Sequence, residues 1–199
     1  MEGRSQTTLA TRERILRAAS DVVTEIGVDA LTMQAVAERA DVALRTLYNH
    51  FESREALALA VYEQLSDATR LVVEKLSLAD TPRERLLAFV AGFYELFEQR
   101  GPGAAAAMAI TTLPEVAARL HEVRTWRTGE LTALLRLAAR DGSLRLPLKP
   151  AVALAFVMTN YVTWQAFVQE RGLSPAAAVR LAQDVLDQTL FGPRPDDTD

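Results

Sequence analysis

Between residues 45 and 49 the sequence places polar side chains of the types that recognise nucleic acids. Arg45, Thr46, Tyr48 and Asn49 follow one another with a single apolar residue among them. Arginine can donate two hydrogen bonds to guanine, asparagine can pair with adenine, and hydroxyl groups can hold phosphates. On a helix, Arg45, Thr46 and Asn49 lie on the face opposite the apolar one, with Tyr48 at its edge. The spacing predicts an exposed helix suited to the major groove of DNA.

Three predicted helices position these side chains. They span about 11–26, 32–40 and 44–51, because apolar residues recur there at helical spacing. The break between the second and the third falls at Asp41-Val42, since aspartate tolerates the left-handed backbone conformation better than most residues. A tight turn between two short helices is typical of a helix-turn-helix, whose last helix enters the major groove.

The inward faces of these helices are expected to be apolar. On the first helix, which Gly27 ends, the expected buried stripe is Ile15, Ala19, Val22, Val23 and Ile26. In the third segment, the residues expected to pack back on the first two helices are Val42, Leu47 and Phe51.

The total charge gives no support to nucleic-acid binding. The chain of 199 residues carries a net charge of −4. Its first sixty residues hold seven Arg and no Lys against nine Asp and Glu, for a net charge of −2. A prediction of DNA binding therefore rests on where the charges lie and not on their sum.

The composition narrows the possible chemistry. The absence of Cys excludes disulfides and thiolate sites, and His50 and His121 are too few for a histidine-rich metal cluster. No glycine-rich phosphate loop occurs, so we expect no cofactor and no enzymatic activity. No run of about 18 apolar residues predicts a membrane span, and the polar N-terminus lacks the apolar core of a secretion signal, so we expect a cytoplasmic protein.

The rest of the chain also follows a helical period. Ser53 is a predicted N-cap, and Thr81-Pro82-Arg83-Glu84 has the pattern of a capping box. The further helices are predicted from Ser53 past Val72, from Pro82 to Gly101, over 104–110, from Pro114 to Asp141, from Pro150 to Gly172 and from Pro175 to Leu190. The fold class is therefore all-α, with about nine helices.

The stretch from Leu31 to Leu57 closely resembles the N-terminal signature of TetR-family regulators. The resemblance lies in the threonine that opens the second helix, in Thr46-Leu47-Tyr48-Asn49-His50-Phe51, and in Ser53-Arg54-Glu55-Ala56-Leu57. The chain departs from the family at two positions of the turn, where Asp41 replaces a glycine and Ala43 replaces a serine. The resemblance implies an N-terminal DNA-binding domain followed by a helical domain for effector binding and dimerisation.

Roles carried from the family fall on matching positions. The implied phosphate contacts are Thr32, Thr46, Tyr48 and Arg54, and further phosphate contacts are expected from Arg4, Arg12 and Arg14 in the N-terminal arm and the first helix. The implied base readers are Gln34, Leu44, Arg45 and Asn49, and His50 completes the DNA-contacting set. Taken singly, each of these residues also fits a role as a solvated surface residue or as part of the core.

The resemblance also implies a domain plan and a mechanism. Residues 1–53 form the DNA-binding domain, 54–192 the effector-binding and dimerisation domain, and 193–199 a disordered tail. The function expected is that of a repressor, released from a palindromic operator of double-stranded DNA when a small-molecule effector selects another conformer. The two last helices are apolar around much of their circumference, which predicts a homodimer through them.

The effector site is expected among large side chains of the second domain. The candidates are Phe89, Phe93, Phe97, Met108, Trp126, Met158, Tyr161 and Trp164. Polar groups to orient a ligand are expected from Asn160, Thr163, Gln165 and His121. Such a set indicates an apolar or aromatic ligand, although an aromatic stripe that only packs the core fits each position equally well.

Two other functions remain open at this point. Carboxylate chemistry, for example with Glu95 and Glu98, would make the chain an enzyme, although such a pair is more often a solvated helix face. A helical interaction module with a degenerate DNA-binding head is the second alternative, which Asp41 and the acidic head make conceivable.

Overall fold

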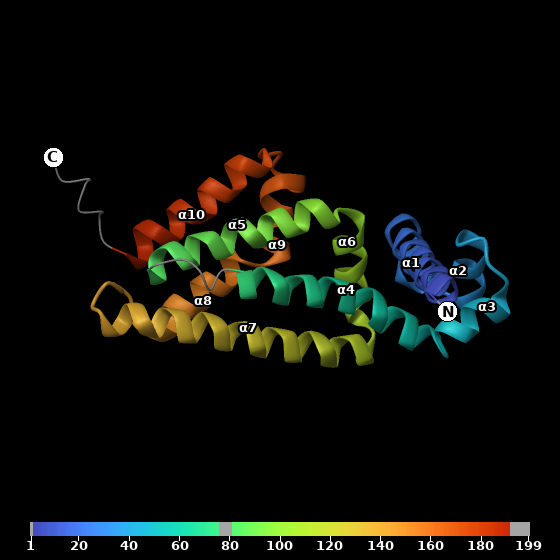
Figure 1. Cartoon of the computed structure of the whole chain (residues 1–199). Helices are drawn as coiled ribbons and strands as arrows, with labels where there is room; N and C mark the ends of the chain where they lie inside the picture. The colour runs from blue at the N-terminus through green and yellow to red at the C-terminus, as the bar shows by residue number, and fades with distance from the viewer. Residues whose placement is uncertain (1, 76–80, 192–199) are drawn as a thin grey trace. The chain divides into compact units, whose positions relative to one another are not determined.

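The structure is a computed structural model that describes residues 2–75 and 81–191, with the side chains of 2–5 left undescribed. Helices and turns account for these ranges, which contain no β-strand, and the predicted all-α class is confirmed (Figure 1). The α-helices are α1 (Glu2–Glu25), α2 (Met33–Arg39), α3 (Leu44–His50), α4 (Arg54–Lys75), α5 (Pro82–Arg100), α6 (Pro102–Ala109), α7 (Pro114–Arg140), α8 (Leu148–Met158), α9 (Tyr161–Gln165) and α10 (Pro175–Leu190). Short helical turns are η1 (Val28–Ala30), η3 (Ile110–Thr112) and η4 (Ala166–Glu170). The tail at 193–199 lies outside the described residues.

The described chain forms two compact units. The first holds residues up to 67 together with 100–122, and the second holds 68–99 together with the residues from 123 onward. The first unit thus contains α1, α2, α3 and α6, and it reaches beyond the predicted division after residue 53. The boundary after residue 53, between a DNA-binding and an effector-binding domain, remains a prediction.

The helix starts follow from local capping. The hydroxyl oxygens of Thr32, Ser53 and Ser174 accept hydrogen bonds from the amide three residues later, at 3.1, 3.1 and 3.3 Å. Thr81 and Glu84 form the predicted capping box, since the Thr81 amide donates to the Glu84 carboxylate at 3.1 Å and the Glu84 amide donates to Thr81 Oγ1 at 3.2 Å.

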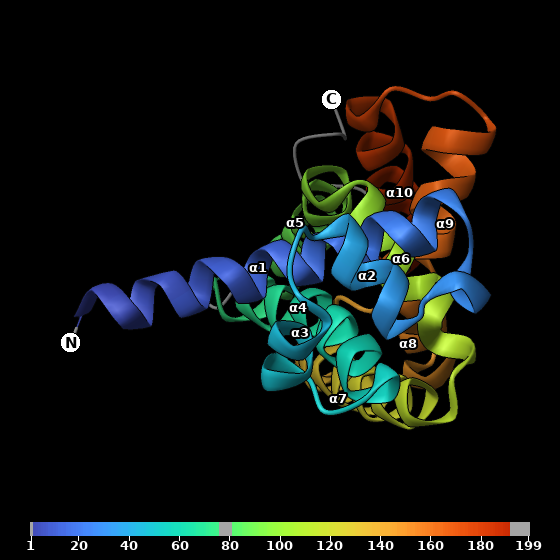
Figure 2. The same cartoon turned by 90° about the vertical axis from the view of Figure 1, so that its right-hand side faces the viewer.

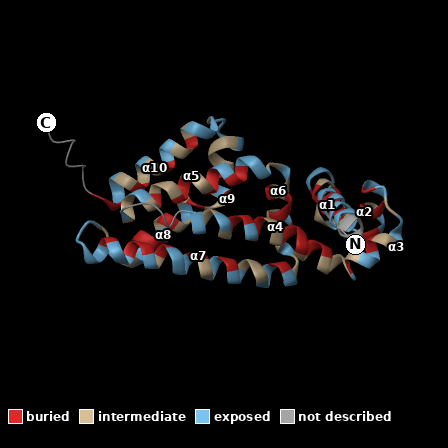
Figure 3. Ribbon diagram, viewed as in Figure 1, coloured by how far each residue is buried: buried red, intermediate tan, exposed pale blue. Residues whose placement is uncertain are grey.

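The core of the first unit lies among α1, α2 and α3 (Figure 3). Ile15, Ala19, Val36 and Leu47 are fully buried, and most of the predicted stripe on α1 is confirmed. The prediction that Ile26 is buried is wrong, because α1 ends at Glu25 and Ile26 is 70% exposed.

The first helix begins earlier than predicted, at Glu2 instead of residue 11. The sequence before residue 11 lacks an apolar stripe, but it also lacks a helix-breaking proline. In Figure 2 the first turns of α1 extend away from α2 and α3, so they need no buried face.

The helix predicted from Pro150 to Gly172 is broken. Helix α8 ends at Met158, and Asn160 caps α9 by accepting a hydrogen bond from the Val162 amide at 3.3 Å. Asparagine favours such caps over helix interiors because its side chain competes for backbone groups. Within the described ranges no single helix is long and apolar enough to cross a membrane; only the bent pair Leu148–Met158 and Tyr161–Glu170 meets that length and composition, with a 52° bend between its halves.

An apolar core and an ion pair between α5 and α10 stabilise the second unit. Leu86, Phe93 and Leu131 are fully buried. The Arg83 guanidinium joins α5 to α10 by donating to both carboxylate oxygens of Asp187, at 2.5 and 2.6 Å.

Helices α4 and α5 also approach closely in this unit. A Cβ atom added at Gly92 would lie 2.7 Å from Val72 Cγ1. This spacing leaves no room for a side chain at position 92.

Candidate nucleic-acid interface and internal aromatic cluster

Helix α3 exposes one face and buries the other. The exposed residues Leu44, Arg45, Tyr48 and Asn49 form what we call the reading face, and Tyr48 is 50% exposed. On the opposite side Leu47 has no exposed surface. The structure shows the predicted outward placement for Arg45, Tyr48 and Asn49, whereas Thr46 is half-buried. The buried side chains of Leu47 and Phe51 fix the rotation of this short helix.

The turn before α3 has the expected left-handed residue. Asp41 has a φ of 51°, and it is the only described residue other than glycine with a positive φ. The Val42 amide donates to the Ala37 carbonyl at 3.0 Å, which closes the turn onto α2. Ala43, at the N-cap of α3, provides no side-chain hydrogen bond.

The remaining predicted DNA-contacting residues border this face. Thr32 and Gln34 are exposed on and before α2, while Thr46 and His50 are half-buried. Thr32 already accepts the capping hydrogen bond of α2, and Gln34 Nε2 donates to Glu38 Oε1 at 2.6 Å. Some members of the predicted set are thus held by partners within the protein.

Arg54 has a structural task that the sequence pattern did not reveal. Its Nε donates to the Leu31 carbonyl at 2.7 Å and its Nη2 to the Val28 carbonyl at 3.0 Å. These carbonyls lie 23 and 26 residues earlier in the chain, so no local spacing could have indicated the contact. The half-buried guanidinium therefore ties the start of α4 to the segment that leads into α2.

Other arginines lie near the first three helices. Arg12 places its Cζ 4.4 Å from the centre of the Phe51 ring, which fixes a positive charge beside the end of α3. Arg14 is exposed on α1. The side chain of Arg4, a further predicted phosphate contact, lies outside the described residues.

The second unit holds a connected set of rings, here called the aromatic cluster: Phe89, Phe93, Phe97, Tyr161 and Trp164. Phe89 stacks on Phe93 with 4.7 Å between ring centres, and Phe93 meets Phe97 edge-on at 6.0 Å. Phe97 lies 5.4 Å from Tyr161 and 6.0 Å from Trp164. The structure thus brings five of the eight predicted ligand residues into contact.

The other three predicted ligand residues take no part in these contacts between rings. Trp126 packs beneath Arg70, whose Cζ lies 4.6 Å from the ring centre. Met158 is half-buried at the end of α8, and Met108 lies on α6 in the first unit.

Two of the four polar residues predicted to orient a ligand form hydrogen bonds with the backbone. Asn160 caps α9, and Thr163 Oγ1 donates to the Val157 carbonyl at 2.6 Å. Gln165 is half-buried on α9, whereas His121 is exposed on α7 in the first unit. Asn160 and Thr163 thus already form hydrogen bonds with the backbone.

A polar side chain beside the rings, that of Arg127, was not predicted from the sequence. Arg127 is 8% exposed, and its Nη1 donates to the Thr159 carbonyl at 3.3 Å. Its Cζ lies 5.6 Å from the Phe93 ring centre and 4.2 Å from that of Phe156. An arginine on a long helix is usually solvated, so its burial among rings gave no sequence signal.

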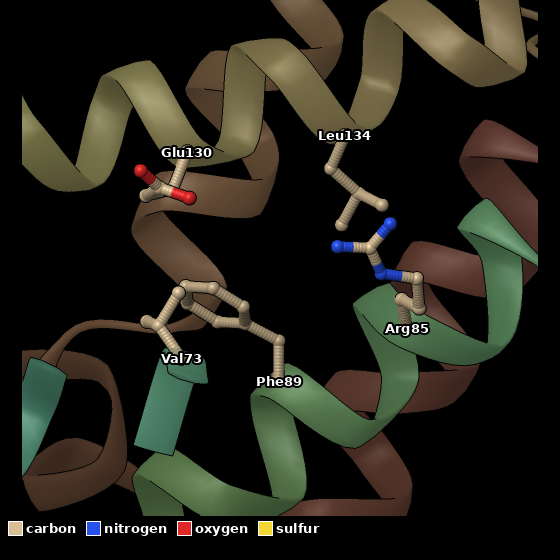
Figure 4. A pocket seen from close by; sticks show the side chains of 5 residues that line it. All are labelled: Val73, Arg85, Phe89, Glu130 and Leu134. Atoms are coloured by element: carbon tan, nitrogen blue, oxygen red, sulfur yellow. The ribbon is translucent and has the colours of Figure 1, made fainter. Parts of the chain in front are cut away.

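A small cavity opens beside the cluster (Figure 4). Val73, Arg85, Phe89, Glu130 and Leu134 line it, and it holds about 250 Å³ of space that includes open solvent. Phe89 belongs to both the cavity and the aromatic cluster. Within the described part of the chain, no group of three or more His, Cys, Asp or Glu residues is placed to hold a metal ion.

Known bacterial regulators share parts of this sequence. Residues 15–61 match the family described as bacterial regulatory proteins, tetR family. The chain is 30% identical over 149 residues to the HTH-type transcriptional activator FasR of Mycolicibacterium smegmatis, a stretch covering 73% of this chain and 67% of FasR. It is 37% identical over 92 residues to the HTH-type transcriptional repressor KstR of the same organism, covering 46% of this chain and 45% of KstR. The chain thus spans less than half of KstR.

The fold is shared with bacterial regulators of known structure. The transcriptional regulator FadR from Bacillus subtilis, solved in complex with stearoyl-CoA, superposes with a TM-score of 0.70 at 18% identity, covering 89% of this chain and 98% of that one. Such an identity shows the fold alone. Together with the helix-turn-helix and the extent of the match to FasR, these likenesses lead to one conclusion: the chain belongs to the TetR family of transcriptional regulators.

Proposed function

We propose that this protein is a ligand-responsive repressor that acts in the cytoplasm as a homodimer on a palindromic operator. The observation that carries the proposal is the reading face, in which Arg45, Tyr48 and Asn49 are exposed while Leu47 anchors the same helix in the core. A rigid helix with exposed donors can enter a major groove without rearrangement of the fold.

Contacts to DNA divide by chemistry. Base readers are the residues whose side chains can pair with base edges or touch a thymine methyl group: Gln34, Leu44, Arg45 and Asn49. Phosphate contacts come from Thr32, Thr46, Tyr48 and Arg54, with His50 at the end of the helix. Arg54 is proposed to contact phosphate in addition to its structural role, in which its guanidinium donates to the carbonyls before α2.

Dimerisation is assigned to α8, α9 and α10. Val157, Val162 and Leu181 are 51%, 59% and 40% exposed on these helices. Large aliphatic side chains gain free energy when a second subunit covers them. A two-fold dimer would present its two α3 helices one turn of DNA apart, about 34–36 Å, and would match a palindromic site.

The effector site is assigned to the second unit, where the aromatic cluster favours an apolar or aromatic ligand. FadR, which shares the fold, binds a small molecule in its solved complex. Ligand and DNA would select different conformers, with a coupling of about 1–3 kcal/mol typical of such systems. Repression is the polarity proposed, as in KstR, whereas FasR is named an activator.

Selection of bound sequences from a random DNA pool tests the proposal directly. We expect a palindromic consensus and, for Arg45→Ala, a loss of discrimination at one base pair of about 1–3 kcal/mol per half-site. Arg45→Lys is the matched control, because it keeps the charge but not the paired hydrogen bonds. Equal losses on selected and random DNA for Arg45→Ala would remove it from the base readers, and a pool without any consensus would end the proposal.

A further inference from the structure

Two buried hydrogen-bond donors in the aromatic cluster have no partner among the described residues. Tyr161 is 4% exposed and Trp164 is 3% exposed. The Tyr161 hydroxyl and the Trp164 indole nitrogen are both shielded from solvent and form no hydrogen bond. Buried tyrosine and tryptophan ordinarily find partners for these groups, because leaving them unpaired opposes folding. Both donors, on neighbouring rings, are therefore available to a ligand that accepts hydrogen bonds.

The two donors belong to one face of one helix. Tyr161 and Trp164 are three residues apart on α9, with their ring centres 5.4 Å from each other. Both rings also contact Phe97 of α5. The Asn160 cap restarts the helix directly before them and so fixes the direction in which both side chains leave the backbone.

The surroundings favour a ligand that accepts hydrogen bonds. The Arg127 guanidinium lies against Phe93, the ring that joins Phe97 to Phe89, and contributes a buried positive charge. Burial raises the pKa of Tyr161, which keeps its hydroxyl protonated and able to donate. An indole N–H can only donate. Donors and a positive charge together complement the electron-rich oxygen of a ligand.

We propose that the effector is a largely apolar molecule with a carbonyl-type oxygen, which accepts hydrogen bonds from the Tyr161 hydroxyl and the Trp164 indole nitrogen while Phe93 and Phe97 pack against its apolar part. The inference deepens the proposed function, on which its regulatory meaning rests. A hydrocarbon of the same shape would leave both donors unpaired, so the oxygen decides which molecules bind.

The first test needs no ligand. Tyr161→Phe removes an unpaired hydroxyl and keeps the ring, so we expect the melting temperature of the free protein to rise by about 2–4 °C. Tyr94→Phe is the reference for this effect: Tyr94 is 2% exposed and its hydroxyl has no hydrogen-bond partner among the described residues, so its removal should raise the melting temperature by a similar amount. Tyr94 takes part in no ring contact of the aromatic cluster, which makes it the control for ligand binding below. A fall in melting temperature for Tyr161→Phe would mean that its hydroxyl has a structural partner, which overturns the proposal.

The second test uses matched probes with the full-length protein. The probes are 9-fluorenone against fluorene, and 2-undecanone against undecane, which differ only in the carbonyl oxygen. We expect at least one ketone, but neither hydrocarbon, to raise the melting temperature. Tyr161→Phe and Trp164→Phe should weaken the binding of that ketone about tenfold each, whereas Tyr94→Phe should bind it as the wild type does.

The outcomes separate this inference from the proposed function. It is overturned if neither ketone raises the melting temperature, if a hydrocarbon raises it equally, or if Tyr161→Phe binds the ketone unchanged. None of these measurements involves DNA. A protein that binds the ketone as expected but ignores every DNA sequence would refute the regulator and leave the site standing, and the reverse result would do the opposite.

Discussion

The reading face of α3 and the aromatic cluster place their polar groups in opposite ways. On α3 the donors point to solvent, where water satisfies them until a ligand arrives, and Leu47 supplies the burial. In the aromatic cluster the donors of Tyr161 and Trp164 are themselves buried, without partners. Exposed donors cost the folded protein little, whereas buried ones lower its stability until something fills the site. Substitutions should therefore affect stability and binding separately in the first region and together in the second.

The largest effect expected comes from two leucines of α3. Leu47→Ala removes a side chain with no exposed surface, so we expect a loss of about 2–5 kcal/mol in the free energy of unfolding. Leu44→Ala removes the same atoms from a residue that is 37% exposed, and stability should change far less while DNA affinity falls. Urea denaturation followed by gel-shift titration measures both. Similar destabilisation by the two variants would contradict the separation of stability from binding in α3.

At Arg54, in the first unit, one substitution should reduce both stability and DNA binding. Arg54→Ala removes two charge-assisted hydrogen bonds to backbone carbonyls, and we expect a loss of about 2–3 kcal/mol in unfolding free energy. Arg54→Lys keeps the charge but has a single nitrogen, so it should recover only part of the loss. A residue that only contacts phosphate would show wild-type stability for both variants and weaker DNA binding for Arg54→Ala alone; denaturation curves decide the matter.

Gly92 tests how tightly the second unit is packed. Gly92→Ala places a Cβ atom 2.7 Å from Val72 Cγ1, which should destabilise the protein by about 1–3 kcal/mol. Adding Val72→Ala should restore part of this stability by removing the clashing methyl group.

Gly129 provides the control on α7, where an added Cβ atom meets nothing within 4 Å. Gly129→Ala should therefore stabilise the protein by about 0.5–1 kcal/mol through helix propensity alone. Thermal unfolding measures all three variants, and equal effects at positions 92 and 129 would show that α4 and α5 tolerate separation.

The smallest effect concerns the start of α3. Ala43 lies at the N-cap with a backbone already extended, at φ −61° and ψ 140°, but offers no side-chain acceptor. The Thr46 amide already donates to the Ala43 carbonyl at 2.8 Å, so the hydroxyl of Ala43→Ser should accept a hydrogen bond from the Arg45 amide and add about 0.5–1 kcal/mol of stability. Ala43→Val, which has no acceptor, serves as the control. A gain with valine as large as with serine would rule out capping as the cause.

Local features of the fold could be predicted from the sequence, and contacts between distant segments could not. The caps at Thr32 and Ser53 and the turn at Asp41 depend on a few neighbouring residues, so their patterns are sufficient. The break at Asn160 was missed because the apolar pattern continues through it.

The candidate site shows the same limit. Motif and helical period placed the reading face, but the partners of Arg54 lie more than twenty residues away. That the donors of Tyr161 and Trp164 lack partners is also a property of the packed structure, since it depends on every atom around them. The number of aromatic residues therefore predicted that Tyr161 and Trp164 belong to the site, but not that their donors lack partners.

Asp41 carries a consequence for selectivity. With its φ of 51°, the residue holds a carboxylate beside the helix proposed to enter DNA. If α3 enters DNA as proposed, repulsion between this carboxylate and the phosphates would act on any sequence, operator or not, and would shorten the residence of the protein on ordinary chromosomal DNA. The proposed base contacts would then account for a larger share of the remaining affinity. A glycine in that position would relieve backbone strain and remove the negative charge, giving a regulator that holds DNA more firmly and distinguishes its target less well.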